Sequence, residues 1–320
     1  MSVHLSIVVP LYNEEENVAA LLERIVAVCR DFDFDYEIIL VDDGSTDNTW
    51  AAIESLKAAT PAMRGIKFRR NYGQTNAMVA GFDHASGEII VTLDGDLQND
   101  PADIPRLLAK LDEGFDIVSG WRKDRQDHFS RVLPSRIANG IISMTTGVRL
   151  HDYGCSLKAY KSECIRPLHA YGDMHRFFPA VASMTGARVA EIVVSHYPRE
   201  RGVSKYGFDR ILKVFSDIFA MSLIIRFSST PLKGFILTAI PFIALTAFFG
   251  LLTLGAILFD WTQGKAVFFI IAAALNAMAV IHLITLGVLG ELAVSSSDLT
   301  HTEMPTLTRK TIPINHGSDQ

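Results

Sequence analysis

The acidic pair Asp94 and Asp96 is the strongest chemical signal in this sequence. The two carboxylates flank Gly95 and directly follow an apolar run at residues 88–93. Carboxylates at this spacing can converge on one hard divalent cation, Mg²⁺ or Mn²⁺, for which a diphosphate supplies further oxygen ligands. A cation there would neutralise a leaving nucleoside diphosphate. The alternative is a plain polar turn, since Asp and Gly are common turn residues.

Two more polar clusters follow apolar runs in the same way. Asp42 and Asp43 come directly after one run, and Tyr12 to Glu14 come after another. Together with the first pair, these clusters bring five acids to strand ends. Mutual repulsion disfavours that arrangement unless a cation or the hydroxyl groups of a ligand bind there. The context therefore favours ligand binding, although Asp43 could instead cap a helix.

Basic residues form two groups that could bind phosphates. The first group lies in a segment rich in Gly and Ser, read as a loop before a helix, and contains Arg199, Arg201 and Lys205. A loop bearing cations can close over phosphates, which Arg binds through paired hydrogen bonds. The second group follows residues 116–120 and contains Arg122, Lys123, Arg125 and Arg131. For Arg122 to Arg125 the alternative is a solvated charged loop.

Asp152 lies where a transferase could place a general base. A sugar hydroxyl acceptor would need such a base to remove its proton. A phosphate acceptor would not, because its second pKa is about 6 and it is largely anionic near neutral pH. We therefore predict that Asp152 positions the acceptor or the donor sugar, with a strand-end turn as the alternative. Among the histidines, which show no metal-ligand spacing, His175 is a candidate sugar contact, and a surface role is the alternative.

The elements that position these residues follow from alternating patterns. Short β-branched apolar runs predict strands at residues 5–10, 36–41, 65–68, 88–93 and 116–120. Helical spacing predicts helices at residues 13–29, 74–85 and 101–113, and Thr46 or Asp47 as the cap of a further helix. The first of these helices should begin with acids in its opening turn. Strands alternating with helices predict a parallel, doubly wound α/β sheet, with ligands beyond the carboxyl ends of its strands.

The C-terminal part of the sequence predicts a membrane module. Residues 234–259 and 266–290 carry no charge, and each exceeds the roughly 20 residues that a helix needs to cross a bilayer. Residues 260–265 join them as a tight hairpin. Basic residues flank the outer ends of the hairpin: Arg226, Lys233, Arg309 and Lys310. The positive-inside rule then places the catalytic domain and both termini in the cytosol.

Two further expectations concern how this module works. Residues 208–227 have helical apolar spacing with charges mostly opposite, which predicts an interfacial amphipathic helix; a helix packed on the soluble core is the alternative. Asn276 and His282 fall in the middle of a span, so they should face another helix, within the hairpin or in a neighbouring subunit.

Composition bounds the remaining possibilities. The 320 residues carry a net charge of −5, which gives no sign of nucleic-acid binding. Three scattered cysteines suggest reduced thiols in a cytosolic compartment. The expected organisation is a cytosolic domain at residues 1–206, an interfacial helix at 207–230, a transmembrane hairpin at 231–294 and a cytosolic tail at 295–320.

Several motifs in order resemble a known family. The stretches VVPLYNEEENV, VDDGSTDNT, NYGQ and LDGDLQNDP are similar to family 2 glycosyltransferases, which have the GT-A fold. The later stretches HDYGCSLKAY and RERGVSKYGF resemble the polyprenyl-phosphate branch of that family. That branch includes dolichyl-phosphate mannose synthase and the bacterial undecaprenyl-phosphate sugar transferases. The resemblance covers roughly residues 5–230, and a two-helix tail is typical of the bacterial members.

This resemblance implies roles for the matching positions. The nucleotide pocket would be lined by Pro10, Tyr12 and Glu14, with Val41 and Asp43 against the base and ribose. The metal and diphosphate would be bound by Asp94, Gly95 and Asp96, with Gln98 beside them. The diphosphate or lipid phosphate would be held by Arg131, Arg201 and Lys205.

The resulting functional expectation is a metal-dependent inverting hexosyltransferase in the bacterial inner membrane. The expected donor is UDP-glucose and the expected acceptor is undecaprenyl phosphate, for a cell-envelope glycan. Alternatives are a donor based on UDP-4-amino-arabinose or GDP-mannose, and a non-catalytic scaffold or flippase partner. A processive polysaccharide synthase is disfavoured because the QxxRW motif is missing; Gly120-Trp121-Arg122 lacks the preceding Gln.

Overall fold

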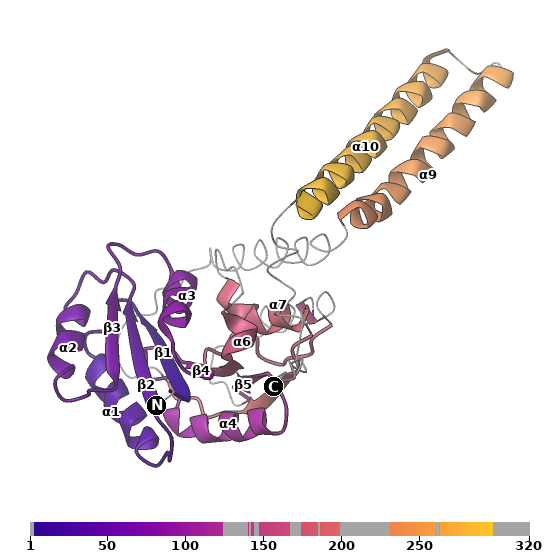
Figure 1. Ribbon diagram of the computed structural model, residues 1–320. Coiled ribbons are helices and arrows are strands. Elements are labelled where there is room, and N and C mark those ends of the chain that lie inside the picture. The colour runs from indigo at the N-terminus through magenta and orange to yellow at the C-terminus, as the bar shows by residue number, and fades with distance from the viewer. Residues whose placement is uncertain are drawn as a thin grey trace, which may run out of the picture. The chain divides into compact units, whose positions relative to one another are not determined.

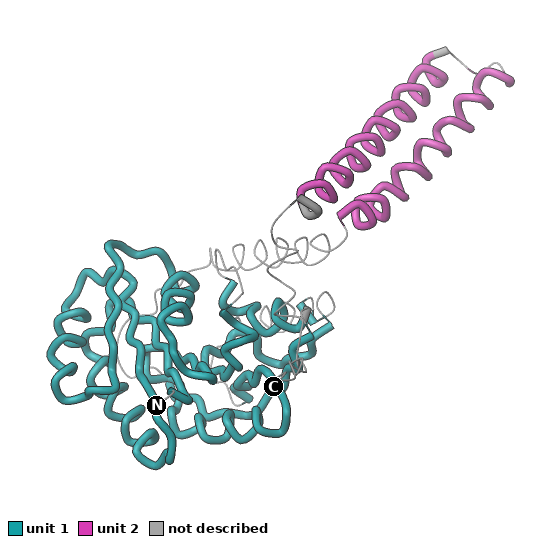
Figure 2. The backbone as a smooth tube through the Cα atoms, in the orientation of Figure 1, with its two compact units in different colours: residues 1–219, 305–320 teal, residues 220–304 magenta. Residues whose placement is uncertain are grey.

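The computed structural model describes residues 3–123, 140, 142–143, 147–166, 174–184, 186–198, 231–259, 261 and 263–296. These residues fall into two compact units, one within residues 1–219 and the other within residues 220–304 (Figure 2).

The first unit is built on one mixed sheet. Its described strands follow the order β3-β2-β1-β4-β6-β5-β7. Their bounds are Leu5–Leu11 for β1, Tyr36–Asp42 for β2, Met63–Lys67 for β3, Ile89–Thr92 for β4, Ile117–Trp121 for β5, Lys158–Lys161 for β6 and Val189–Val193 for β7. Strand β6 runs antiparallel to both of its neighbours, and every other pairing is parallel. The predicted α/β sheet is confirmed, and it is parallel except at β6.

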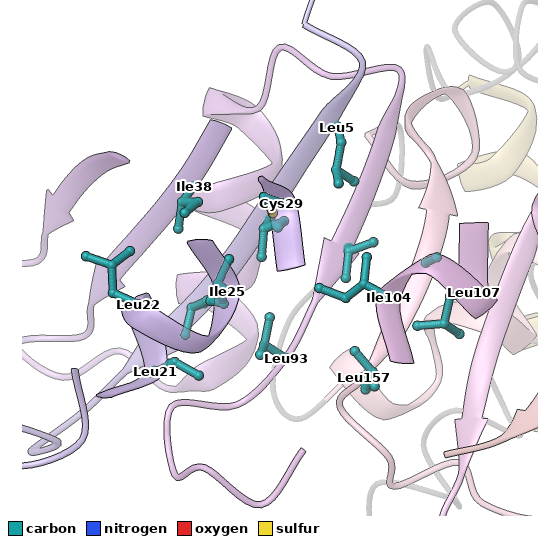
Figure 3. Close-up of a cluster of buried hydrophobic side chains, with 14 of the residues drawn as sticks. Leu5, Leu21, Leu22, Ile25, Cys29, Ile38, Leu93, Ile104, Leu107 and Leu157 are labelled. Carbon is teal, nitrogen blue, oxygen red and sulfur yellow. The ribbon is translucent and has the colours of Figure 1, made fainter. Parts of the chain in front are cut away.

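One face of the sheet is covered by helices α1 (Val18–Cys29) and α4 (Ile104–Asp112) (Figures 1 and 3). Side chains alternate across a strand, so Leu5, Ile7, Val9 and Leu11 of β1 all enter this core cluster. Leu21 and Ile25 meet them from α1 because residues four apart lie on the same helix face. Burial of each such side chain contributes about 1.5–3 kcal/mol.

The opposite face is covered by α3 (Gln74–His84) and α7 (Phe178–Met184). Gly81 of α3 lies so close to β1 that an added Cβ would sit 2.2 Å from Cγ1 of Val8. Phe82 packs against the rings of Tyr160 on β6 and Phe178 on α7, with ring centroids 6.2 and 5.7 Å apart. The remaining short elements are α2 (Thr49–Leu56), α6 (Ser162–Ile165) and the 3-10 helices η1 (Pro101–Asp103) and η2 (Met174–Arg176).

The first predicted helix begins later than expected. Residues 13–17 form a loop, and α1 starts at Val18 with no acid in its first turn. The physical reason is that this loop binds the loop after β2. The carboxylate of Glu15 accepts from the backbone N–H of Asn48 at 2.8 Å, and Asn13 adopts a left-handed conformation with φ of 53°. The prediction of acids in the opening turn was therefore wrong.

Other boundaries shift by only a few residues. The helix predicted at residues 101–113 is the 3-10 turn η1 followed by α4. Thr46 or Asp47 was predicted to cap the helix after β2. The N-cap residue of α2 is instead Asn48, and its side chain makes no capping hydrogen bond. Asp47 still accepts from the backbone N–H and hydroxyl of Thr49, at 3.0 and 2.6 Å.

The second unit is a hairpin of two long helices, α9 (Pro231–Leu258) and α10 (Gln263–Ser296). Both are long and apolar enough to cross a membrane. Helix α9 begins before the uncharged segment at residues 234–259 and ends one residue short of it, and α10 extends beyond the segment at 266–290 at both ends. Large apolar side chains stand exposed on the hairpin; Leu251 is 70% exposed. The described part of the hairpin therefore has an exposed apolar surface of the kind that lipid covers in a membrane.

The two helices meet closely where α9 begins and α10 ends. An added Cβ on Gly287 would lie 3.0 Å from Cβ of Phe235, and one on Gly290 would lie 2.9 Å from Cβ of Pro231. The carboxylate of Glu291 accepts from the backbone N–H of Leu232 at 3.1 Å. This N–H is one of the first-turn donors that have no partner within their own helix.

Candidate active site

The predicted polar clusters lie at one edge of the sheet. Strands β2, β1 and β4 are parallel neighbours, so their carboxyl ends lie together. Tyr12 to Glu14 follow β1, Asp42 ends β2, and Asp94 to Asp96 follow β4. We call this the carboxyl edge. Strand β5 points the same way, because it and β4 are both antiparallel to β6, and so Arg122 joins this edge.

The loops after β1 and β2 bind each other. The backbone N–H of Asn13 donates to the hydroxyl of Ser45 at 2.9 Å, and the side-chain oxygen of Asn13 accepts from the N–H of Thr46 at 2.8 Å. The N–H of Glu14 donates to the hydroxyl of Thr49 at 2.8 Å. The polar residues of both motifs therefore hold one another and fix the shape of this part of the edge.

Asp43 fixes the loop that leads into α3. Its carboxylate accepts from the backbone N–H groups of Tyr72 and Gly73, at 2.7 and 2.9 Å. Burial raises the pKa of Asp43, and these two N–H groups act in the opposite direction. Gly44 follows with φ of 67°, and an added Cβ would meet backbone atoms of Arg70 at 2.2 Å. A ribose contact for Asp43 stays a prediction, and the structure assigns its carboxylate a loop-holding role.

Asp94 and Asp96 form the acidic pair of the edge. The amide of Gln74 in the first turn of α3 donates to Oδ1 of Asp94 at 2.7 Å, and the N–H of Gln98 donates to Oδ1 of Asp96 at 3.2 Å. Burial and the neighbouring Asp96 carboxylate raise the pKa of Asp94. A Cβ on Gly95 would lie 2.3 Å from Cδ2 of Leu11, so the turn needs glycine to approach β1 this closely.

This pair fits a divalent cation chemically. Two hard carboxylates repel each other here, and a cation between them would relieve that repulsion. Within the described part of the chain, no group of three or more His, Cys, Asp or Glu side chains could hold a metal. Phosphate oxygens of a bound ligand could supply further coordination to a cation on Asp94 and Asp96.

Arg122 and Asp152 form a buried ion pair beside the acidic pair. Nε and Nη2 of Arg122 donate to the two carboxylate oxygens of Asp152, at 2.7 and 3.0 Å. The Arg122 side chain is only 14% exposed, and its charge favours the ionised form of Asp94. A solvated loop, which was the alternative for this basic residue, is therefore wrong for Arg122. Arg122 directly follows β5, as the acids directly follow other strands, and this position could have indicated that it belongs to the site.

Asp152 is almost saturated with hydrogen bonds. Besides the guanidinium, it accepts from the backbone N–H groups of Gly154 at 3.1 Å and of Arg122 at 3.4 Å, and it is 4% exposed. A carboxylate held in this way is poorly placed to take a proton from a substrate. This geometry agrees with a positioning role for Asp152, which stays a prediction.

Lys158 is a buried cation that the sequence reasoning missed. It begins β6, is 2% exposed, and donates from Nζ to the carbonyl of Tyr153 at 3.1 Å and to that of Cys155. Burial lowers its pKa to about 8, while the charges of Asp152 and Asp94 oppose this shift. Lys158 thus ties down the turn after Asp152 and places a second positive charge behind the acidic edge.

The other predicted residues are placed as follows. Pro10, Tyr12, Glu14 and Gln98 are partly buried at the edge, whereas Val41 is fully buried in β2. The amide of Gln98 donates to the carbonyl of Tyr197 at 3.4 Å. His175, the candidate sugar contact, pairs through Nδ1 with the hydroxyl of Thr75 at 2.8 Å. Outside the described residues lie Arg125, Arg131, Arg199, Arg201, Lys205 and the predicted interfacial helix at 208–227.

Comparisons with known proteins agree with this arrangement. The sequence model described as Glycosyl transferase family 2 matches residues 6–167. Dodecaprenyl-phosphate galacturonate synthase of Rhizobium johnstonii is 46% identical over 235 residues, which are 72% of this chain and 70% of the relative. Undecaprenyl-phosphate 4-deoxy-4-formamido-L-arabinose transferase of Edwardsiella ictaluri is 42% identical over 231 residues, 72% of this chain and 69% of the relative.

Solved structures show a likeness in fold. Glucosyl-3-phosphoglycerate synthase from Mycobacterium tuberculosis, in complex with Mn²⁺, UDP-glucose and phosphoglyceric acid, matches with a TM-score of 0.55 and 21% identity, over 69% of this chain and 79% of that one. Mannosyl-3-phosphoglycerate synthase from Rubrobacter xylanophilus matches with a TM-score of 0.55 and 15% identity, over 69% and 74% of the two chains. At these identities the likeness shows the GT-A fold alone.

Proposed function

Because the chain belongs to glycosyl transferase family 2, we propose that it transfers a sugar from a nucleotide-sugar donor to a polyprenyl phosphate, with inversion at the anomeric carbon. The observation that carries this proposal is the buried Arg122–Asp152 pair beside the acidic pair at one edge of the sheet. Two curated relatives that match over more than two thirds of their length are named as polyprenyl-phosphate transferases.

Arg122 is suited to bind an anionic acceptor. Nε and Nη2 of its guanidinium donate to Asp152, and Nη1 donates no hydrogen bond to any of the described residues. The outer edge of the guanidinium can therefore donate to a phosphate oxygen, and Asp152 fixes the direction in which it points. A phosphate acceptor attacks as an anion, so the site needs no general base.

Asp94 and Asp96 would hold the divalent cation on the donor side. When bound, the cation stabilises the negative charge of the nucleoside diphosphate as it leaves. The residues of the chain then have separate tasks. The acidic pair would hold the cation on the donor side, the loops after β1 and β2 would bind the nucleoside, and Arg122 with Asp152 would orient the acceptor.

The donor sugar is the least constrained part of this proposal. The relatives are named for galacturonate and for 4-deoxy-4-formamido-L-arabinose. Neither sugar is glucose, so these names do not support the expectation of UDP-glucose. L-Arabinopyranose has the ring configuration of D-galactopyranose without its sixth carbon. The two sugars named in these relatives therefore both have an axial substituent at C4. We propose a donor with this axial C4 group in place of the equatorial hydroxyl of glucose.

The helical hairpin supports a membrane location for this reaction. Two exposed apolar helices of spanning length suit a protein that reaches its substrate from the bilayer. The proposed orientation has the catalytic domain and both termini in the cytosol, which follows from the flanking basic residues. Placement in the inner membrane and self-association through the two helices remain predictions.

The test uses the full chain purified in detergent with a polyprenyl phosphate and a divalent cation. We expect product with uridine diphosphate donors of galacturonate, galactose or 4-deoxy-4-formamido-L-arabinose, which share the axial C4 group, and much less with that of glucose. Asp96→Asn should abolish transfer, whereas Asp83→Asn on the exposed side of α3 should not change it. Transfer only to a soluble glycan would contradict the lipid acceptor. No transfer from any donor would favour the scaffold alternative.

A further inference from the structure

Glu191 lies in the middle of β7, beneath the turn that carries Asp152. Its carboxylate side chain is 10% exposed, and its residue pairs with Ser119 of β5 in the sheet register. One carboxylate oxygen, Oε1, accepts from the backbone N–H groups of both His151 and Asp152, each at 3.0 Å. The other, Oε2, accepts from the same His151 N–H at 3.0 Å and from Nδ1 of His151 at 2.7 Å. A strand carboxylate thus holds two consecutive residues of the turn.

The same turn is fixed from its outer side by an aromatic contact. The imidazole of His151 stacks on the indole of Trp121, with centroids 4.1 Å apart and planes 15° apart. Trp121 directly precedes Arg122 and ends β5. The two partners of the ion pair, Arg122 and Asp152, are therefore each next in sequence to a member of this stacked pair. Glu191 holds His151 in the stack through its ring nitrogen.

We propose that Glu191 is a positioning residue for the acceptor site, acting through Asp152 on Arg122. Two N–H groups donating to one oxygen define both the height and the direction of the residue 151–152 backbone. The backbone position of Asp152 sets the orientation of its carboxylate, and the two hydrogen bonds from the guanidinium to this carboxylate set the orientation of Arg122. A shift of about 1 Å at such a group can cost about a hundredfold in rate. This inference rests on the proposed function, because it takes Arg122 to contact the acceptor.

Glu37 provides a matched control at the opposite end of the sheet. It is a strand carboxylate with similar burial, its side chain being 9% exposed. It accepts from the hydroxyl of Ser6 at 2.7 Å and from the N–H of Ser86 at 2.6 Å. It also forms an ion pair with a partly exposed arginine, Arg64, at 3.3 Å. Loss of Glu37 should reduce stability as loss of Glu191 does, without reaching the carboxyl edge.

The experiment compares Glu191→Ala, Glu191→Gln and Glu37→Ala in the full chain. We expect Glu191→Ala to lower kcat by 10- to 100-fold, on the order of a misplaced catalytic group, with the KM for the nucleotide sugar unchanged. Glu191→Gln keeps an oxygen for the two backbone N–H groups and should recover much of this loss. Glu37→Ala should keep the kcat of the wild type when rates are referred to the folded fraction.

A double-mutant cycle tests the route of the effect. If Glu191 acts through Asp152, then adding Glu191→Ala to Asp152→Asn should cost less than twofold more. Full additivity of the two losses would overturn the proposal, as would an unchanged kcat in Glu191→Ala or an equal fall in Glu37→Ala.

A second readout does not depend on activity. In a variant with Trp50→Phe and Trp261→Phe, Trp121 is the remaining tryptophan, and its fluorescence emission reports on its stacking with His151. Glu191→Ala should shift this emission and Glu37→Ala should not. If the wild type transfers no sugar to any lipid phosphate, the proposed function fails by itself. An unshifted emission in Glu191→Ala would then overturn the positioning role separately.

Discussion

The side-chain amide of Gln74 donates to Oδ1 of Asp94 at 2.7 Å, which ties the first turn of α3 to the acidic pair. The residue that precedes this helix, Gly73, is in turn held by Asp43. The start of α3 therefore links the carboxyl ends of β2 and β4 through hydrogen bonds. Asp94 keeps a defined orientation before any cation or substrate arrives.

We expect Gln74→Ala to weaken use of the divalent cation. Without the amide, Asp94 can rotate away from the direction shared with Asp96, and the loss of such a supporting partner costs roughly tenfold or more in affinity or activity. The measurement is the initial rate as a function of Mn²⁺ or Mg²⁺ concentration. Asn76→Ala, whose amide donates to the carbonyl of Tyr72 instead, is the control. Equal cation dependence in both variants would contradict this role for Gln74.

Breaking the Arg122–Asp152 pair should cost both stability and activity. Arg122→Leu leaves the carboxylate of Asp152 buried without its counter-charge, and such losses are about 3–5 kcal/mol. The thermal unfolding midpoint of the first unit should therefore fall by several degrees, and transfer should become undetectable. Lys110→Ala removes one partner of an exposed ion pair with Glu113 and should cost about 1 kcal/mol or less. A midpoint unchanged in Arg122→Leu would refute the buried pair.

Lys158 should make stability depend on alkaline pH. Its pKa is about 8 in the folded chain because burial disfavours the ammonium form, against a normal value of 10.5. Between these two values the unfolded chain binds more protons than the folded one, so this residue makes stability rise with pH in that window. The difference of about 2.5 pKa units corresponds to about 3 kcal/mol over the whole window.

The measurement is the unfolding midpoint from pH 7 to pH 10.5, as the difference between wild type and Lys158→Met. Taking this difference cancels the other groups that titrate there. It should change steadily above pH 8, and the same difference for the surface variant Lys110→Met should stay flat. Parallel curves for wild type and Lys158→Met would show that the buried ammonium does not titrate in this range.

The helical hairpin should tolerate a larger side chain at Gly250 but be destabilised by one at Gly287. Gly287→Leu would force its side chain into Leu232 and Phe235, whose atoms already lie 3.0–3.2 Å from an added Cβ. We expect a lower thermal midpoint and faster proteolysis of the hairpin in detergent, since overpacking typically costs 1–3 kcal/mol. Gly250→Leu adds the same side chain to α9 where nothing lies within 4 Å. Equal sensitivity of the two variants would rule out close packing at Gly287.

The carboxyl edge was predictable because it depends on local patterns. Each acidic cluster directly follows an apolar run, and parallel neighbours bring such ends together whatever the details of the fold. The family motifs, including the acidic pair at Asp94 and Asp96, are likewise contiguous in sequence. These parts of the site therefore need no knowledge of long-range pairing.

The support behind the edge was not predictable from the sequence. Strand β6 is four residues long, begins with a charged residue and pairs with strands on both sides, so periodicity gives no sign of it. Glu191 contacts residues 39 and 40 positions away, and Arg122 contacts one 30 positions away. Such pairs follow from sheet order, which a single sequence does not specify.

The hydrogen bond between Glu291 and Leu232 has a consequence for how the chain is made. The acceptor for the opening of α9 lies 59 residues downstream, near the end of α10. During translation, Leu232 is added 59 residues before that carboxylate exists, so its N–H must be solvated or bound by another group in the meantime. We expect the nascent hairpin to close only once α10 has been synthesised almost completely, which makes insertion of the two helices a paired event.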